Sequence, residues 1–187
     1  MFRFYSPPEN ISEDKIIILD KKEIHHLKNV LRLKKDDLVF VFDGQFNEYE
    51  TKILDLSDSK ITLKIINRRI LSKRNVEITV ASAIPKGKRF DFVVEKLTEL
   101  GVNRIIPLKT DRSIVNLGEK SLRFRRWQNI ILNSCKQSKR VDFLILEPQI
   151  EFKDILKRKG EFHLCLIATL SLPGKNLREI LKEKTEK

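Results

Sequence analysis

Residues 77–108 read EITVASAIPKGKRFDFVVEKLTELGVNRIIPL, and this stretch decides the fold of the second part of the chain. It begins with a strand-like run, Glu77–Ile84, which Pro85 ends. Apolar residues then recur at helical spacing, namely at Phe90, Val93, Val94, Leu97 and Leu100. Gly101 has the character of a helix-ending residue, and Val102–Leu108 returns to a strand pattern. A strand, a helix and a strand in so short a span predict a βαβ unit with two parallel strands.

Alternation of helix and strand continues along the rest of the chain. The further expected elements are a helix over Ser121–Ser138, a strand over Phe143–Leu146, a short helix near Phe152–Leu156, a strand over His163–Ala168 and a helix around Asn176–Lys184. This alternation is typical of an α/β domain whose parallel sheet is covered by helices, and we expect it to occupy residues 75–187. Trp127, at helical spacing with Ile130, is expected in the core or in a dimer interface.

Residues 1–71 follow another pattern, with short strands, tight turns and one helix. The expected strands are Lys15–Leu19, Leu38–Phe42, Tyr49–Leu56 and Lys60–Ile66, and the expected helix is Lys21–Arg32. Asp43-Gly44 between two strands indicates a hairpin, because both residues tolerate a positive φ. We therefore expect a small β-barrel in residues 1–71, with the boundary to the α/β domain near Leu71–Asn75.

Positive charge is concentrated in the second part of the chain. The formal net charge is +12; residues 1–72 hold 13 Lys and Arg against 12 Asp and Glu, whereas residues 73–187 hold 25 against 14. Within Arg104–Arg140, ten basic residues stand against two acidic ones. Such a field suits a polyanion, because each neutralised phosphate releases condensed counterions. Charge alone leaves open a second interpretation, a solvated lysine-rich surface.

The sequence argues against several other classes of protein and site. Cys135 and Cys165 form no CxxC pair, which opposes a disulfide framework or a zinc site and predicts two small core residues. The three histidines do not cluster, and no phosphate-loop, dinucleotide or hydrolase motif occurs, so we expect no metal site. With no signal-peptide core and no long apolar run, the sequence predicts a soluble, cytoplasmic protein that does not bind a membrane.

Three segments together carry a resemblance to a known family. They are His26–Arg32 with Val41–Gly44, then Pro85–Arg89 leading into Glu95–Val102 with Arg112-Ser113 beyond, and last Arg126–Ile130 through Cys135–Arg140. Their order and spacing resemble the bacterial 16S rRNA uracil-(N3)-methyltransferases of the SPOUT superfamily. The resemblance runs from about Phe4 to Leu146, and its most specific pieces are K-x-T-E-L-G-V and Q-S-x-R.

The resemblance implies a fold and an activity. Members of this family have an N-terminal PUA-like β-barrel and a C-terminal α/β domain tied in a trefoil knot, and they act as homodimers. They methylate N3 of a uridine in the 16S rRNA of the small ribosomal subunit, with S-adenosylmethionine as the methyl donor. The lack of a nucleophile motif fits this chemistry, because the sulfonium cofactor carries the reactivity. The alternatives are a non-catalytic RNA-binding protein and an α/β enzyme with another anionic ligand.

Position in the expected fold and the resemblance together give the candidate site residues. The expected catalytic residues are Arg112, in a loop beyond a strand end, and Gln137 and Arg140, which match Q-S-x-R. The expected RNA contacts are His26, Arg32, Lys86, Lys88, Arg89, Arg123, Arg125 and Arg126. The lysines among them follow a strand end, the edge at which α/β proteins bind ligands. The chain departs from the family pattern at Lys136, where an acidic or small residue is usual, and in lacking a proline soon after Arg140.

The resemblance also sets an expectation for the cofactor. Family members continue with a glycine-rich loop that builds the knot and encloses S-adenosylmethionine, and this sequence stops at Lys187 without such a loop. The knot segment is therefore expected to be missing from this chain, with the cofactor contacts beyond Lys187. The purified chain should bind S-adenosylmethionine very weakly and show no methyl transfer, because close approach to a cofactor normally needs glycine-rich loops. Calorimetric titration with S-adenosylmethionine measures the binding. Micromolar binding by residues 1–187 would contradict this expectation.

Overall fold

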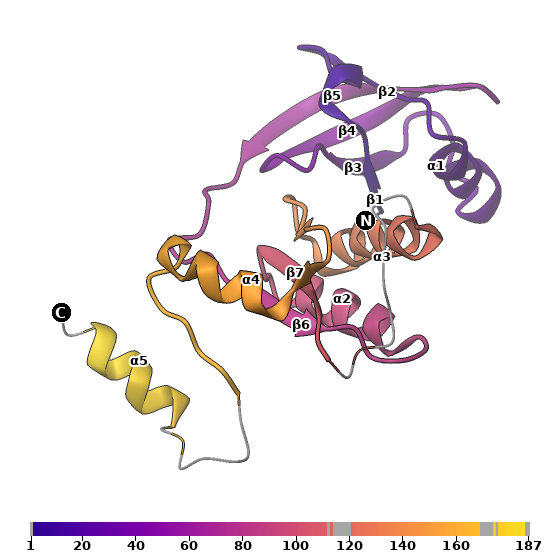
Figure 1. Cartoon of the computed structure of the whole chain (residues 1–187). Helices are drawn as coiled ribbons and strands as arrows, with labels where there is room; N and C mark the ends of the chain where they lie inside the picture. The colour runs from indigo at the N-terminus through magenta and orange to yellow at the C-terminus, as the bar shows by residue number, and fades with distance from the viewer. Residues whose placement is uncertain (1, 112, 114–120, 169–173, 175, 186–187) are drawn as a thin grey trace. The chain divides into compact units, whose positions relative to one another are not determined.

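A computed structural model describes residues 2–111, 113, 121–168, 174 and 176–185 (Figure 1). The chain divides into two compact units, residues 1–152 and residues 153–187, and each is described by itself. All the strands of the described residues lie in the first unit, which contains two separate sheets.

The first sheet has five strands in the order β1-β3-β4-β5-β2. The strands are β1 (Arg3–Tyr5), β2 (Lys15–Ile18), β3 (Leu38–Phe42), β4 (Asn47–Leu56) and β5 (Ile61–Ile70). β1 and β3 are parallel and the other neighbours antiparallel, and register shifts between β4 and β5 bend the sheet. No strand pairing within the described residues joins the edge strands β1 and β2, although the Ser6 hydroxyl donates to the Ile17 carbonyl at 3.4 Å. The small barrel predicted from the sequence is therefore incompletely closed, and residues 3–70 are called the half-barrel below.

A short helical segment covers one side of the half-barrel. It consists of α1 (Lys21–His25) followed by a π-helical turn, η2 (His26–Val30), while a 3-10 turn, η1 (Pro8–Asn10), lies earlier in the chain. The carboxylate of Asp20 caps α1 by accepting from two backbone N–H groups at 2.8 and 3.0 Å. Ile24 and Leu27 are buried in the half-barrel core. The helix predicted over Lys21–Arg32 ends at Val30, and Arg32 has a left-handed backbone with φ 52°.

The second sheet is parallel and confirms the predicted βαβ unit. Its elements are β6 (Thr79–Ala83), α2 (Arg89–Glu99), β7 (Arg104–Lys109), α3 (Leu122–Ser138), β8 (Ile145–Leu146) and β9 (Ile150–Glu151). β7 lies between β6 and β8, and β9 pairs with β7 farther along the strand. Trp127 is buried in α3 and packs on Phe90 of α2, with ring centroids 4.6 Å apart, so it is a core residue.

The end of α2 shows why the chain turns where it does. Gly101 has φ 83°, its N–H donates to the Thr98 carbonyl, and the next N–H, of Val102, donates to the Leu97 carbonyl. These two bonds form a Schellman cap, which the sequence pattern predicts from the glycine. Leu100, counted among the apolar positions of the predicted helix, is 74% exposed because it stands at the cap itself, past the buried stripe.

The half-barrel and the α/β part share a core. Phe42 of β3 is fully buried among residues of the second sheet and its helices. Its ring and that of Tyr5 pack against Phe143, at centroid distances of 5.8 and 5.0 Å. Gly44, in the predicted hairpin turn, forms a β-bridge with Asp142. The contacts across the predicted boundary are thus extensive enough for residues 1–152 to form one unit.

The second unit differs from the sequence prediction in two respects. It contains the end of α4 (Phe152–Lys157), η3 (Arg158–Glu161) and α5 (Leu177–Thr185). The strand predicted over residues 163–168 is irregular, because no neighbouring strand within the described part of this unit is present to satisfy its backbone hydrogen bonds. Cys165, predicted in the core, is exposed in this irregular segment, whereas Cys135 is buried. None of the described helices is both long and apolar enough to cross a membrane.

Two glycines with nearly the same backbone offer a test of the shared core. Gly44 and Gly87 have φ values of 77° and 81°, but an added Cβ would lie 2.5 Å from the Phe143 ring at Gly44 and would meet nothing within 4 Å at Gly87. Gly87→Ala should cost about 1 kcal/mol of backbone strain, and Gly44→Ala roughly 1–3 kcal/mol more, because the Phe143 ring packs against Tyr5 and Phe42 and would have to shift. Urea unfolding followed by the fluorescence of Trp127 measures both changes. Equal losses of unfolding free energy would mean that the ring yields easily.

Candidate functional site: a basic surface and a groove

The N-terminal parts of α2 and α3 lie side by side and present cations to solvent. The Asp91 carboxylate of α2 accepts from Trp127 Nε1 at 2.9 Å and pairs with Arg126 Nη2 at 2.6 Å, both from α3. These contacts, with the Phe90–Trp127 packing, fix the two helix starts next to each other. The surface they form carries six of the predicted RNA contacts, namely Lys86, Lys88, Arg89, Arg123, Arg125 and Arg126, and is called the basic surface below.

Local structure explains why these cations are exposed together. Gly87, with φ 81°, turns the chain between β6 and α2 so that Lys86 and Lys88 point into solvent. The Ser121 hydroxyl caps α3 by accepting from the Phe124 N–H at 3.2 Å, and α3 has no acidic residue in its first turn. The positive ends of the helix dipoles add to the charge of the side chains. The basic surface is therefore suited to a polyanion.

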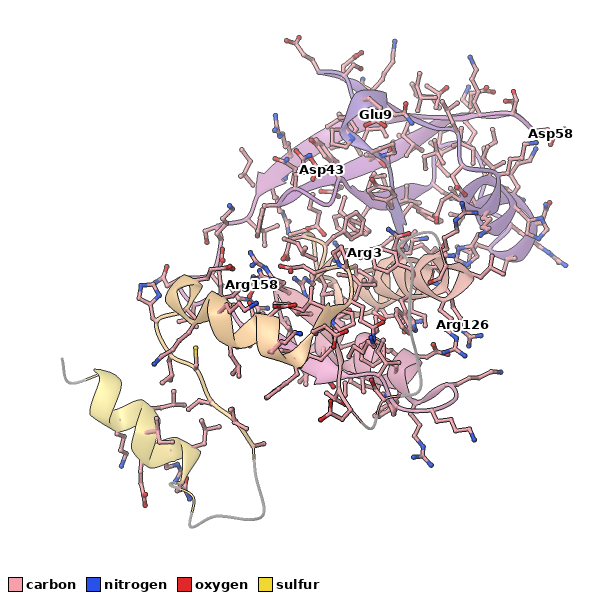
Figure 2. The ribbon with its side chains drawn as sticks, in the orientation of Figure 1. Arg3, Glu9, Asp43, Asp58, Arg126 and Arg158 are labelled. Carbon is pink, nitrogen blue, oxygen red and sulfur yellow. The ribbon has the colours of Figure 1, made fainter. Side chains whose placement is uncertain are left out.

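Arg126 differs from its neighbours on the basic surface. Its ion pair with Asp91 leaves the side chain 52% exposed, and Figure 2 shows it reaching outward beside α3. An exposed pair of this kind contributes little to stability, about 0–1 kcal/mol. Its charge is nevertheless partly offset by Asp91, whereas Arg123 and Arg125 are exposed without an ion pair in the described part of the chain. We expect Arg123 and Arg125 to dominate binding of a polyanion to α3.

Arg140, a predicted catalytic residue, is an internal anchor in the structure. Its side chain is 5% exposed, and Nη1 donates to the carbonyls of Thr98 and Val102 at 3.2 and 2.6 Å. Nη2 pairs with Asp142 at 2.7 Å. Arg140 thus binds the C-terminal end of α2, which lies roughly 16 Å from the start of that helix and hence from the basic surface.

The other predicted site residues are not gathered at one place. Gln137 is exposed near the C-terminal end of α3, at the opposite end of that helix from Arg123. His26 is half-buried with its ring edge against Phe4, at a centroid distance of 5.9 Å, and Arg32 is exposed beyond η2. Arg112 lies outside the described residues. The structure therefore brings together six of the predicted RNA contacts and separates them from His26, Arg32, Gln137 and Arg140.

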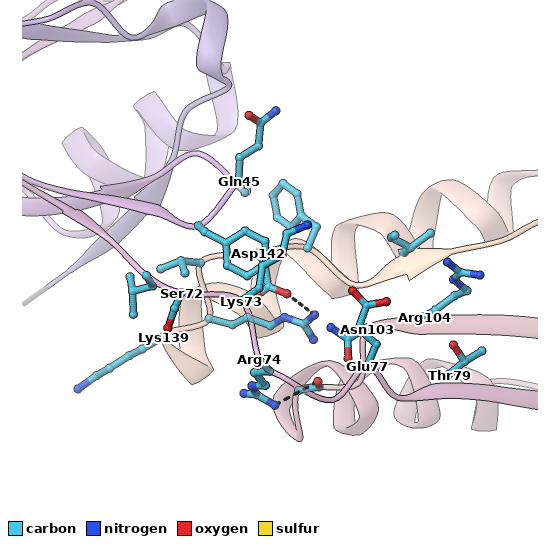
Figure 3. A pocket seen from close by; sticks show the side chains of 18 residues that line it. Gln45, Ser72, Lys73, Arg74, Glu77, Thr79, Asn103, Arg104, Lys139 and Asp142 are labelled. Atoms are coloured by element: carbon cyan, nitrogen blue, oxygen red, sulfur yellow. Dashed lines mark hydrogen bonds and ion pairs between the residues drawn. The ribbon is translucent and has the colours of Figure 1, made fainter. Parts of the chain in front are cut away.

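A groove on the other side of the first unit was not predicted from the sequence. It has a volume of about 650 Å³ and lies between the hairpin turn of the half-barrel, the linker before β6 and the turn after α3 (Figure 3). Its charged lining residues are Lys73, Arg74, Glu77, Arg104, Lys139, Arg140 and Asp142. The Ser-Lys-Arg-Asn stretch at residues 72–75 was the available signal, but it was interpreted as a domain boundary because it interrupts both periodicities.

Neither site offers a metal ligand set or an activated cysteine among the described residues. No group of His, Cys, Asp and Glu within the described residues could hold a metal ion. Burial raises the pKa of the Cys135 thiol to about 12, because the low-dielectric surroundings disfavour the thiolate. Cys135 therefore stays protonated at neutral pH. What the described side chains can do is bind and orient an anionic partner.

Two parts of this chain match the sequence models of known domain families. Residues 72–187 match the sequence model of a family described as RNA methyltransferase domain. Residues 19–66 match one described as RNA methyltransferase PUA domain. The first match covers more than half of the chain and includes the α2 and α3 helices that carry the basic surface.

Individual proteins similar to this chain are also named as RNA methyltransferases. The ribosomal RNA small subunit methyltransferase E of Synechocystis is 32% identical over 186 residues, which are 97% of this chain and 59% of that protein. Two solved structures are also similar. A methyltransferase from Legionella pneumophila, in complex with its bound cofactor SAM, has a TM-score of 0.83 at 26% identity, over 95% of this chain and 74% of that one. The small subunit methyltransferase E of Neisseria gonorrhoeae, bound to S-adenosyl methionine, has a TM-score of 0.73 at 30% identity, over 83% and 64%. The chain spans about 60% of the length of the curated relatives it matches.

The basic surface leads to a salt-dependence prediction. Replacing Arg123 and Arg125 with Ala should weaken binding of a single-stranded RNA and flatten the plot of log K against log[salt] by about 1.4, because each lost phosphate contact removes roughly 0.7 from the slope. Arg126→Ala alone should change the slope less, since Asp91 already offsets its charge. Fluorescence anisotropy at several salt concentrations measures both. Lys60→Ala with Lys64→Ala, two exposed lysines of the half-barrel, is the matched control; an unchanged slope for the arginine variant would mean that its charges are only solvated.

Proposed function

Because this chain belongs to the RNA methyltransferase family, we propose that it is part of an S-adenosylmethionine-dependent enzyme that methylates ribosomal RNA. The observation that carries the proposal is the family match over residues 72–187, together with the PUA-domain match over residues 19–66. The geometry supports it through the exposed basic surface at the start of α2 and α3, where phosphates can bind. The acceptor is proposed to be N3 of a uridine in the 16S rRNA of the small subunit. The names of the relatives support the RNA of the small subunit as the acceptor, and the resemblance of three motif segments supports N3 of a uridine.

The described residues hold and orient RNA in this proposal. When bound, S-adenosylmethionine supplies an activated methyl group on a sulfonium, so the protein needs no nucleophile of its own. The groove of about 650 Å³ does not fit that cofactor, because its lining cations would repel the sulfonium and it lies by Asn103 and Arg104, at the amino ends of the strands. α/β proteins bind such ligands at the carboxyl ends. We therefore assign no cofactor contact to the described residues.

Roles of single residues follow from their surroundings. We propose phosphate contacts for the basic surface and, on the half-barrel, for His26 and Arg32, which are accessible there. Arg140 is proposed as a positioning residue, since its guanidinium is occupied by carbonyls and Asp142. Catalytic roles for Arg112 and Gln137 rest on their places in the resemblance. Residues 1–71 are proposed as the PUA-like RNA-binding domain and residues 75–187 as the methyltransferase domain of a homodimeric cytoplasmic enzyme.

A methyl-transfer assay tests the proposed function. The complete product of the gene that encodes these residues is incubated with radiolabelled S-adenosylmethionine and small ribosomal subunits from a strain that lacks the endogenous modification. Label should enter 16S rRNA, and mass spectrometry of the digested nucleosides should identify N3-methyluridine. Arg123→Ala with Arg125→Ala should raise KM for the subunits with a smaller effect on kcat, because a phosphate contact is made equally before and during methyl transfer.

The outcomes separate the alternatives. Label in another nucleoside would retain a ribosomal RNA methyltransferase and overturn the N3 assignment. RNA binding without transfer by the complete gene product would favour a non-catalytic RNA-binding protein. The control variant Lys60→Ala with Lys64→Ala removes two cations that lie outside the basic surface, in the turn before β5 and in β5, and should raise KM less.

A further inference from the structure

The groove found above is built from three chain segments that hold one another in place. The Phe46 N–H, in the hairpin turn of the half-barrel, donates to the Val141 carbonyl at 3.3 Å. The Leu71 N–H, at the start of the linker, donates to the Phe46 carbonyl at 2.8 Å. Phe46 itself has φ 68°, a left-handed conformation that a bulky residue rarely adopts, and these two bonds hold it there. The walls of the groove are therefore preorganised.

The charges in the groove favour an anionic ligand. Five cations and two carboxylates line it, but Arg140 is paired with Asp142 and Arg104 with Glu147. Three cations, Lys73, Arg74 and Lys139, thus remain against Glu77. Neither Lys73 nor Lys139 makes an ion pair within the described part of the chain, and both are exposed. Figure 3 shows the Lys139 side chain extending from the rim, away from the other labelled side chains. The two lysines are thus placed to bind phosphates at the mouth of the groove.

The groove also offers contacts to a nucleobase. The Lys73 ammonium lies 5.8 Å from the centroid of the half-buried Phe46 ring, so an aromatic surface and a cation stand together. Arg74 donates through Nη1 to the Gly101 carbonyl at 3.2 Å, which leaves guanidinium donors for a ligand. Asn103 accepts from the Ile78 N–H at 2.9 Å through Oδ1, which leaves its Nδ2 hydrogens as donors. Unpaired bases of RNA are recognised by aromatic stacking combined with such donors.

We propose that this groove binds one unpaired nucleotide of the RNA substrate, with the base against Phe46 and the flanking phosphates on Lys73 and Lys139. The volume of about 650 Å³ lies within the range of roughly 300–1,000 Å³ of small-molecule sites, so it admits an extruded nucleotide but not an RNA duplex. The inference rests on the proposed function, because it takes RNA as the substrate. The groove lies by the C-terminal end of α2, at Gly101, and the basic surface at its start, so the two contact different parts of one RNA.

Binding measurements with matched variants test the proposal. Lys73→Ala with Lys139→Ala should lower the affinity for a single-stranded 16S rRNA fragment by roughly tenfold and reduce the salt slope by about 1.4. The same variant should bind a fully paired RNA duplex as the wild type does. Lys60→Ala with Lys64→Ala removes the same charge outside the groove and should lower the affinity for the single strand less. An unchanged affinity of the groove variant for the single strand would overturn the proposal.

Photocrosslinking gives a second readout that does not depend on removing charge. Gln45 is exposed at the mouth of the groove and is replaced by p-benzoylphenylalanine, and Ser59, in the turn before β5, is replaced in the same way as a control. Irradiation with the RNA fragment should crosslink position 45 to an unpaired nucleotide and leave position 59 uncrosslinked. Equal yields at both positions would overturn the proposal.

Two further results distinguish this inference from the proposed function. If the wild-type protein binds no RNA, the proposed function itself fails. If the wild type binds RNA and methylates it while both groove tests are negative, the groove inference fails alone. Competition by uridine monophosphate or inorganic phosphate as strong as that by RNA would identify a small-molecule site and overturn the inference.

Discussion

The buried guanidinium of Arg140 is the interaction on which the arrangement of the first unit depends. A charge that is almost fully buried is tolerated when it is paired and hydrogen-bonded. Nη1 and Nη2 of Arg140 meet this requirement through two carbonyls at the end of α2 and the carboxylate of Asp142, while Nε has no hydrogen-bond partner among the described residues. Asp142 in turn bridges to Gly44 and Gln45 in the hairpin turn of the half-barrel. One side chain thereby connects the C-terminal end of α2, the turn after α3 and the first sheet, and the groove lies where these three meet.

Other buried charges at the same junction are also ion-paired, although not all of their polar atoms make a hydrogen bond among the described residues. Arg3 of β1 pairs with Glu48 at 2.9 Å and lies over the Phe42 ring, between the half-barrel and α3 in Figure 2. Its burial lowers the pKa of the guanidinium, and the charge of Glu48 opposes that change. Lys136, which departs from the family pattern, pairs with the buried Glu23 of α1. The departure therefore has a partner in the half-barrel, and the pair links α1 to α3.

Cations of the same type do different things in this molecule because their burial differs. Arg123 and Arg125 stand on an exposed helix face, so their charge is available to a phosphate. Arg140 and Lys136 lie within one turn of each other in sequence, yet both are used internally. A sequence that lists ten basic residues in Arg104–Arg140 does not separate these groups. Only some of the cations predicted to form an RNA surface are therefore accessible: Arg123 and Arg125 are exposed, whereas Lys136 and Arg140 are not.

The sequence by itself determined the elements whose signals are local. Apolar spacing predicted α2 and α3, strand composition predicted β3 with the bounds that the structure has, and Gly101 predicted the helix cap. Each of these signals depends on a few neighbouring residues. The structure alone decided what depends on distant partners. Residues 163–168 have strand composition but no neighbouring strand among the described residues, and Cys165 is exposed for the same reason. Arg140 is held inside the molecule because the fold places Thr98 and Asp142 beside it. The groove could not be predicted from the sequence, because its walls come from residues 44–46, 71–79 and 139–145. The local pattern of each segment does not show that the other two lie beside it.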